Sequence, residues 1–199
     1  MENERYEQLR QIKEEVLALT QSPLYTYRTD NKYHPVIGEG NHFATILFVG
    51  EAPGRNEAEQ GRPFCGAAGK ILDELLAHAG IDRKTVYVTN IVKDRPPENR
   101  DPTLDEIALY APFLDRQINI IQPKIIATLG RYSMAYIMNK FGLEKDLQTI
   151  SRIHGKKFSA PAGYGNVTII PFYHPAVATY QRSLLPEMKK DFEILKSIK

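Results

Sequence analysis

The chain of 199 residues has little cysteine and no long apolar run. Its single cysteine, Cys65, cannot form a disulfide within the chain or supply a cysteine-only zinc or iron–sulfur site. No apolar run approaches the roughly 20 residues that cross a bilayer, and the first residues are typical of a charged helix rather than a signal peptide. We therefore expect a cytoplasmic (intracellular) protein without a membrane partner.

The chain also lacks a strong excess of either charge. With 26 Lys and Arg against 24 Asp and Glu, its net charge is +2, so composition alone gives no signature of nucleic-acid binding. A local basic face remains compatible with this balance, because phosphate affinity depends on where charges lie. The length, with 42% hydrophobic and 25% charged residues, favours one globular domain over residues 1–199.

Apolar segments typical of strands alternate with segments of helical periodicity. The pattern predicts strands at 45–49, 86–89, 125–129 and 167–173, and helices at 3–19, 68–79, 103–122, 131–140 and 183–198. Thr103 and Glu106 form a capping-box pattern, and Pro123 ends that helix. Residues 22–42 read as a polar connection, 95–102 as a loop and 141–166 as a mixed segment. This alternation indicates an α/β fold with a mostly parallel sheet between helix layers.

Each predicted strand ends in residues suited to binding a ligand. The first runs into the glycine-rich turn 50–54, which contains Glu51, and the others run into Asn90, Gly130 and His174. In open α/β sheets, ligands bind outside the carboxyl ends of the strands. A carboxylate, an amide and an imidazole are therefore expected to face one crevice, as in a binding or catalytic site.

Three of these side chains fit the chemistry of a nucleobase. The amide of Asn90 offers a donor and an acceptor that match the N3–H and O4 edge of uracil, and a flipped amide would accept cytosine instead, so the surroundings must fix its orientation. An Asn after a strand is more often a turn cap. Phe64, on a stiff loop between Pro63 and Cys65, could stack on a base or belong to the core. A neutral His174 could donate to an oxygen that becomes negative as a bond breaks.

Several cations lie in or near the loops that follow the predicted strands. Arg95, Arg100, Arg152 and Arg182 are candidates for DNA phosphate contacts. For any single one of them, a solvated surface charge is the alternative.

Taken together, the motifs resemble those of the family 4 uracil-DNA glycosylases, the iron–sulfur type. The resemblance covers roughly residues 17–198 and is carried by Gly-Glu-Ala-Pro-Gly at 50–54, Gly-Arg-Pro-Phe at 61–64, Gly66-x-x-Gly69, Val-Thr-Asn-Ile-Val-Lys at 88–93, Arg-Pro-Pro-x-Asn-Arg at 95–100, Pro-Lys-Ile-Ile-Ala-Thr-Leu-Gly at 123–130 and His-Pro-Ala at 174–176. Any one of these motifs is common, whereas the ordered set is specific.

The resemblance implies a three-layer α/β/α sandwich around a central four-stranded sheet. It implies hydrolysis of the N-glycosidic bond of uracil in single- or double-stranded DNA by a monomer, giving free uracil and an abasic site. Phe64 would stack on the extruded uracil, Asn90 would read its edge, His174 would contact O2, and Gly50 and Glu51 would line the site. The general base is Glu51 or Glu57, with Glu51 preferred. The chemistry of the hydrolysis itself needs no metal or organic cofactor.

The chain departs from this family in the stretch after Gly54, where only Glu57 remains of a usually acidic segment, and more largely at the iron–sulfur cluster. The family holds a [4Fe–4S] cluster with four cysteines, and the corresponding positions here are Leu19, Ser22, Asp94 and Tyr110. We therefore expect a cluster-free relative in which apolar packing by Leu19 and Tyr110 replaces the cluster.

Two other readings remain open. A relative with altered chemistry could excise hypoxanthine or xanthine, or trap the sugar covalently on a histidine, for which His154 is the candidate. A lesion sensor could bind uracil in DNA without cutting it.

Overall fold

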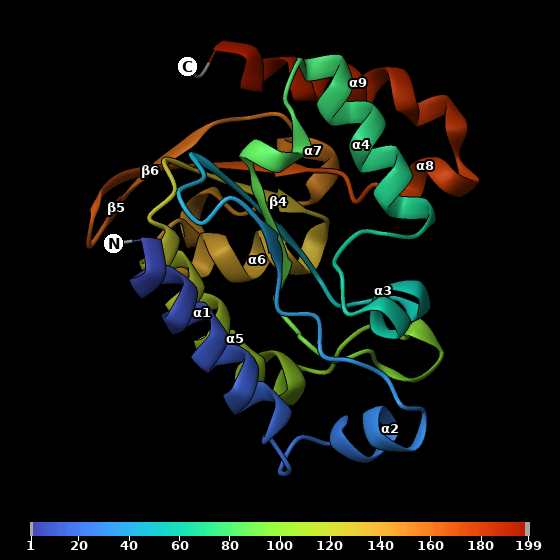
Figure 1. The fold of residues 1–199 in the computed structure, drawn as a ribbon. Helices are drawn as coiled ribbons and strands as arrows, with labels where there is room; N and C mark the ends of the chain where they lie inside the picture. The colour runs from blue at the N-terminus through green and yellow to red at the C-terminus, as the bar shows by residue number, and fades with distance from the viewer. Residues whose placement is uncertain (1, 198–199) are drawn as a thin grey trace.

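The computed structural model describes residues 2–197 and contains a six-stranded sheet flanked by helices (Figure 1). The strands lie in the order β1-β3-β2-β4-β6-β5. Their bounds are β1 Glu39–Gly40, β2 Ile46–Gly50, β3 Tyr87–Asn90, β4 Ile125–Leu129, β5 Phe158–Ala162 and β6 Gly165–Phe172.

The four predicted strands are the four central ones, and they pair in parallel as expected. This confirms the α/β class with a central, mostly parallel sheet. The structure adds an antiparallel strand at each edge, β1 beside β3 and β5 beside β6. Both fall in segments from which no strand was predicted. β1 has only two residues, and β5 contains Pro161, which is tolerated mainly at a sheet edge.

The main predicted helices are present, with small shifts at their ends. The helices are α1 Glu2–Leu17, α2 Tyr25–Asp30, α3 Arg55–Gln60, α4 Ala67–Ala79, α5 Leu104–Ile121, α6 Arg131–Lys140, α7 Ile150–Ile153, α8 Val177–Tyr180 and α9 Leu185–Phe192. The capping box is confirmed: Thr103 Oγ1 accepts from the Glu106 N–H at 3.2 Å, and the Glu106 carboxylate accepts from the Thr103 N–H at 2.8 Å. The helix predicted over 183–198 is divided between α9 and a 3₁₀ turn at Glu193–Ser197, and residue 198 lies outside the described residues.

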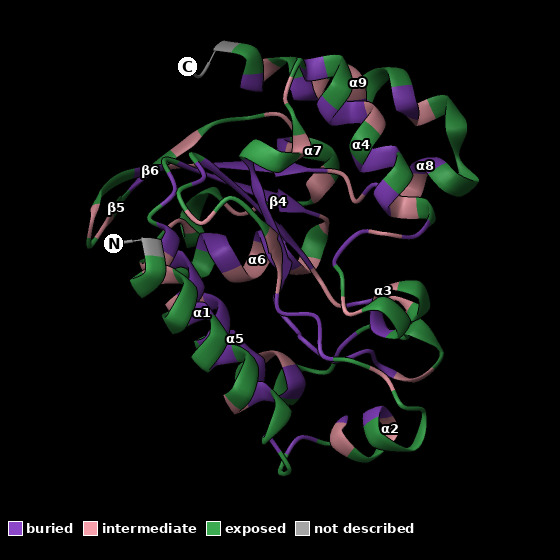
Figure 2. Cartoon of the chain, in the orientation of Figure 1, coloured by how far each residue is buried: buried purple, intermediate pink, exposed green. Residues whose placement is uncertain are grey.

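Alternate residues of the central strand β2 face opposite helix layers. Ile46 and Phe48 pack in one apolar cluster with residues of α4 and α9. Leu47 and Val49 pack in a second cluster with residues of α1, α5 and α6. Figure 1 shows these two helix groups on opposite sides of the sheet, and Figure 2 shows buried strands with exposed outer helix faces. The result is the three-layer sandwich that the sequence predicted.

The strand order places the carboxyl ends of β2, β3, β4 and β6 along one edge of the sheet. From β2 the chain crosses to β3 on one side, and it then returns to β4 on the other side. Such a reversal opens a crevice at the carboxyl ends of the strands, where open α/β sheets bind their ligands. In the described part of the chain, no helix has the length and apolar character required of a membrane span.

Candidate active site

A cavity of about 350 Å³ lies where β2, β3 and β6 end. Its lining comes from the turn after β2, from α3 and the start of α4, from the end of β3, from the loop before α5 and from the residues after β6. The lining residues are Glu51, Ala52, Pro53, Gly54, Glu57, Phe64, Ala68, Asn90, Pro96, Asn99, Arg100, His174 and Ala176. The structure thus brings together all of the predicted catalytic and base-contacting side chains. Gly130, at the fourth strand end, instead packs behind His174: an added Cβ would lie 3.1 Å from the His174 Cβ.

Asn90 presents an unsatisfied acceptor to this cavity. The residue is only 2% exposed, and its Oδ1 has no hydrogen-bond partner among the residues that the structure describes. A buried polar atom without a partner costs about 1–3 kcal/mol. A turn-capping Asn would have its side-chain oxygen bonded. The arrangement therefore fits a side chain held ready for a ligand that donates a hydrogen bond.

Gly50 provides the space in which Asn90 and Phe64 meet. The two strand ends are in register, with Gly50 opposite Asn90. A Cβ at Gly50 would lie 2.3 Å from Asn90 Oδ1 and 2.7 Å from Phe64 Cζ. The role of Gly50 is therefore steric, because any side chain there would displace the amide or the ring.

Phe64 belongs to both the core and the cavity wall. It is 6% exposed and packs with the apolar cluster on the α4 face, and its ring centre lies 5.7 Å from that of His174. Its φ of +49° lies in the left-handed region, which non-glycine residues rarely adopt. Such a conformation persists only where the surroundings enforce it, often at a ligand site.

The structure predicts that Gly69→Ala destabilises the protein, although Gly→Ala inside a helix is ordinarily stabilising. Gly69 is in the first turn of α4, and an added Cβ would lie 1.8 Å from the carbonyl oxygen of Phe64. Relieving a clash with backbone requires Phe64 to move, at a cost of about 1–3 kcal/mol. Thermal and denaturant unfolding measure this cost. Gly163→Ala is the control, because no described residue other than its chain neighbours lies within 4 Å of the new Cβ. Equal stability of the two variants would contradict this packing.

His174 is held as a neutral imidazole with a defined tautomer. Burial lowers its pKa to about 4, against a smaller opposing effect of the Glu57 charge. Its Nδ1 accepts a hydrogen bond from the Ala176 N–H at 3.1 Å. Since Nδ1 acts as the acceptor, the proton of the neutral ring lies on Nε2. The side chain can therefore donate from Nε2.

The two candidate carboxylates occupy different environments. Glu57 Oε1 accepts from the backbone N–H groups of Cys65 and Gly66, at 3.0 and 2.7 Å, and so fixes the turn before α4. Burial raises the pKa of Glu51 to about 7; the Asp101 charge adds to this effect and Arg131 opposes it. A carboxyl group in a cleft with a pKa near neutrality suits acid–base chemistry. This contrast supports Glu51 over Glu57 as the base.

Lys93 was not among the predicted site residues, yet it bonds to the backbone of Asn90. Lys93 is fully buried, and its Nζ donates to the Asn90 carbonyl oxygen at 2.6 Å, to Thr89 Oγ1 at 2.9 Å and to Gln117 Oε1 at 2.5 Å. Burial lowers its pKa well below the usual range. The lysine was part of the quoted motif at 88–93, but nothing in the sequence indicated that it points inward toward Gln117.

The four arginines proposed for phosphate contacts lie in different settings. Arg100 lines the cavity and pairs with both carboxylate oxygens of Glu106, at 2.6 and 2.8 Å. Arg152 is exposed on α7, and Arg182 is exposed beside Glu74. Arg95 is only 8% exposed and donates to Asn99 and to the hydroxyl groups of two tyrosines, so its placement does not favour a phosphate contact.

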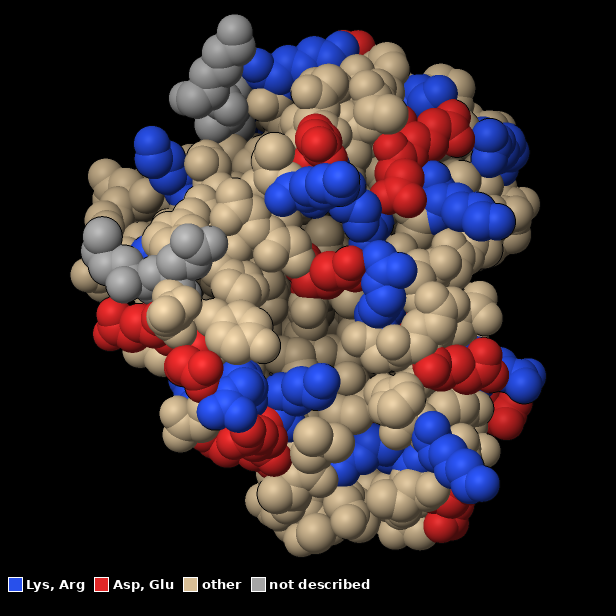
Figure 3. Space-filling view, in the orientation of Figure 1, with Lys and Arg blue, Asp and Glu red and all other residues tan. Residues whose placement is uncertain are grey.

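The surface around these elements carries mixed charge. Figure 3 shows Lys and Arg interspersed with Asp and Glu, without a continuous basic band on the face it displays. Arg182 and Lys189, for example, both pair with Glu74. On this face, cations are therefore interspersed with carboxylates rather than gathered into one basic patch.

Comparisons with known proteins agree with this architecture. A family model described as the uracil DNA glycosylase superfamily matches residues 37–196. The type-4 uracil-DNA glycosylase of Sulfurisphaera tokodaii is 44% identical over 96% of this chain and 84% of its own length. Those of Archaeoglobus fulgidus and Saccharolobus solfataricus are 43% and 40% identical, over 94% and 93% of this chain and 91% and 83% of their own lengths. The chain therefore belongs to the uracil DNA glycosylase superfamily.

Proposed function

We propose that the protein hydrolyses the N-glycosidic bond of uracil in DNA, releasing free uracil and leaving an abasic site. The observation that carries this proposal is the unpartnered, buried Oδ1 of Asn90 in a cavity that also holds Phe64, Glu51 and His174. The relatives are named uracil-DNA glycosylases, which supports DNA as the substrate. A base inside the duplex hides its glycosidic bond, so the enzyme extrudes the uracil into the cavity.

Asn90 and Phe64 recognise the extruded base. The N3–H of uracil donates to the open Asn90 Oδ1, and the amide nitrogen donates to O4. Cytosine presents an acceptor at N3, so it leaves Oδ1 unsatisfied. Phe64 stacks on the base, a contact worth about 1–3 kcal/mol. Gly50 leaves room for both groups.

His174 and Glu51 act on the two charges that separate as the bond breaks. The transition state resembles an oxocarbenium ion, with positive charge on the sugar and negative charge on the base. His174 donates from Nε2 to the O2 atom of the departing uracil, which suits a ring that stays neutral. Ionised Glu51 stabilises the sugar cation, orients the attacking water and accepts the proton that the water loses as its oxygen bonds to the sugar. The uracil anion takes up a proton as it leaves as free uracil. His174 and Glu51 therefore stabilise the negative and the positive charge of the transition state, respectively.

The rate of excision is expected to rise with pH through an apparent pKa near 7. The active form of Glu51 is the carboxylate, and its pKa is about 7, so the rate falls roughly tenfold per pH unit below that value. His174, with its pKa near 4, stays neutral over the whole range from about pH 5 to 9. Single-turnover rates on a uracil oligonucleotide measure this profile. Glu51→Gln is expected to abolish the rise of the rate with pH and to slow the reaction, whereas Glu57→Gln is expected to keep that rise. A flat wild-type profile from about pH 5 to 8 contradicts the role of Glu51.

Stability gives a second test of Glu51 that does not depend on activity. Because the folded state raises this pKa, it binds the proton more tightly than the unfolded state does. The ionised group therefore destabilises the fold at pH values above about 7, and this cost disappears as the pH falls through 7 toward 4.5. Glu51→Gln should raise the unfolding temperature at pH 8 and leave it near the wild-type value at pH 5.

Incubation with oligonucleotides followed by alkaline cleavage tests the proposed function itself. Single- and double-stranded substrates bearing uracil, hypoxanthine or xanthine are compared with undamaged DNA. We expect abasic sites only in the substrates that contain uracil, at the position of the uracil, in both single- and double-stranded DNA. Cleavage at hypoxanthine or xanthine instead would identify the relative with altered chemistry, and binding without cleavage would identify a lesion sensor. Sedimentation with and without DNA tests the proposed monomer.

A further inference from the structure

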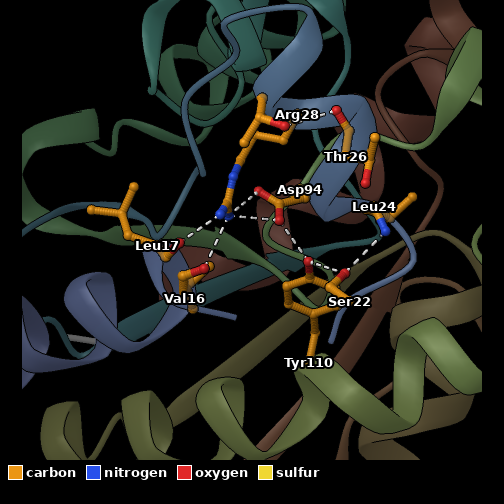
Figure 4. Close-up of polar contacts among 9 residues, drawn as sticks. Val16, Leu17, Ser22, Leu24, Thr26, Arg28, Asp94 and Tyr110 are labelled. Carbon is orange, nitrogen blue, oxygen red and sulfur yellow. Dashed lines mark hydrogen bonds and ion pairs between the residues drawn. The ribbon is translucent and has the colours of Figure 1, made fainter. Parts of the chain in front are cut away.

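A chain of buried polar side chains connects the N-terminal part of the fold to α5 (Figure 4). The Leu24 N–H donates to Ser22 Oγ at 3.1 Å, and Ser22 Oγ lies 2.7 Å from the hydroxyl oxygen of Tyr110. Tyr110 in turn donates to Asp94 Oδ2 at 2.6 Å, and Arg28 donates to both Asp94 oxygens at 2.8 and 3.1 Å. Because the Tyr110 hydroxyl uses its hydrogen in the bond to Asp94, the Ser22 hydroxyl donates to Tyr110. We call Ser22, Arg28, Asp94 and Tyr110 the anchor network.

Arg28 extends this network to the end of α1. Its guanidinium donates to the carbonyl oxygens of Val16 and Leu17, at 2.9 and 2.7 Å. Those carbonyls belong to the last turn of α1, where the helix itself leaves acceptors unpaired. Arg28 is 4% exposed and Asp94 is 1% exposed. A single guanidinium therefore ties α1, α2 and the loop after β3 together inside the protein.

The resemblance to the family 4 enzymes implies that the anchor network lies at the positions of their cluster cysteines. Those positions are Leu19, Ser22, Asp94 and Tyr110, and three of them are members of the network. Protein iron–sulfur clusters are held by cysteine thiolates, and none of these residues is a cysteine.

The remaining donors do not restore such a site. Cys65 lies in the turn before α4, where its backbone N–H donates to Glu57, and burial raises the pKa of its thiol. Within residues 2–197, no group of three or more His, Cys, Asp or Glu side chains is placed to hold a metal ion. The residues present therefore do not fit an iron–sulfur cluster.

We infer that the anchor network replaces the cluster as the link between the N-terminal segment and the rest of the fold, and that the protein folds without iron. Two contacts of the network connect segments that are distant in sequence: the hydrogen bond between Ser22 and Tyr110, and the ion pair between Arg28 and Asp94. Breaking a buried ion pair on one side leaves an uncompensated charge and is strongly destabilising. The apolar packing that was expected to replace the cluster accounts for only part of this link. Leu19 is buried as expected, but Tyr110 makes its link through the hydroxyl group.

The anchored loop leads directly into the cavity wall. Asp94 is followed within a few residues by Pro96, Asn99 and Arg100, which line the cavity. Arg95 continues the attachment, since it donates to the hydroxyl of Tyr33 at 2.7 Å, just after α2. The N-terminal segment and the cavity wall are therefore held by the same group of contacts.

Iron content and chelation provide the first test. Protein produced with ample iron and purified without oxygen is expected to show no visible charge-transfer absorbance and far less than one iron atom per chain. A chelator combined with a reductant is expected to leave the unfolding temperature unchanged. Stoichiometric iron, or a chelator-dependent fall in the unfolding temperature, would overturn the inference.

Variants of the network provide the second test. Arg28→Met leaves the buried Asp94 carboxylate without its cation, and is expected to lower the unfolding temperature by roughly 10 °C. Tyr110→Phe removes one oxygen atom and is expected to lower it by a few degrees. The control is Arg10→Met on α1, whose arginine pairs with Glu7 and Glu14 at the surface and should have almost no effect.

Limited proteolysis shows which segment of the chain is destabilised in these variants. Arg28→Met and Tyr110→Phe are expected to speed cleavage within residues 17–33 relative to Arg10→Met, because this segment loses its attachment. If Arg28→Met does not fold, Tyr110→Phe still supplies the comparison. Unfolding temperatures and cleavage rates equal to those of Arg10→Met would overturn the inference.

Discussion

An Asn90→Asp variant is expected to excise uracil several hundred-fold more slowly than the wild type, about the effect of a misplaced buried polar contact worth 2–4 kcal/mol. Asn90 lies at the end of β3 with its Oδ1 open to the cavity. An ionised aspartate can accept from N3–H, but it offers no donor to O4 and opposes that oxygen with like charge. Single-turnover excision rates on one uracil duplex measure the change.

Two comparisons make the Asn90 result specific. Asn90→Ala is expected to lose a similar amount of activity, because it removes both the donor and the acceptor. Asn139→Asp, on the exposed end of α6, adds the same charge away from the cavity and should keep the wild-type rate. If Asn90→Asp and Asn90→Ala both excise uracil as fast as the wild type, Asn90 is a turn residue and does not read the base.

His174→Ala is expected to slow the chemical step by about 100–1,000-fold, the usual cost of losing one donor to a developing oxyanion. The ring is neutral, and its Nδ1 is occupied by the Ala176 N–H, so Nε2–H is the group that is lost. Phosphate contacts supply most of the affinity for DNA, so binding should change little. Single-turnover rates and fluorescence anisotropy separate the two quantities.

A second histidine and a partial replacement serve as controls for His174. His78→Ala removes an imidazole that pairs with Glu193 at the surface and should leave the rate unchanged. His174→Gln retains a side-chain donor and should recover part of the lost rate. Wild-type single-turnover rates in His174→Ala would show that His174 makes no contact that matters to the departing base.

The sheet and its site-bearing edge were predictable because their signals are local. Alternation of apolar strands with periodic helices identified the four parallel strands, and the pair Thr103 and Glu106 located the start of α5. Once the strands are placed in parallel, their carboxyl ends must share an edge, so Glu51, Asn90 and His174 meet by topology alone.

Features that depend on contacts between distant segments were not predictable. α2 and α3 have six residues each, too few to display a helical period. The sequence shows the charge of Arg95 but not that two tyrosines enclose it. Likewise, nothing in the sequence reveals that the Glu57 carboxylate is already bonded to backbone, which separates it from Glu51.

The pairing of strands far apart in the chain determines when the active site can exist. Ile46 pairs with Ile125, and Ile125 pairs with Thr168, so the sheet closes over long loops. Closing such loops costs entropy before any contact compensates for it, which makes parallel sheets slow to form. His174 enters the cavity only after β6 has joined β4. During synthesis Asn90 leaves the ribosome before His174, so the cavity lacks its donor to the departing base until β6 has paired with β4.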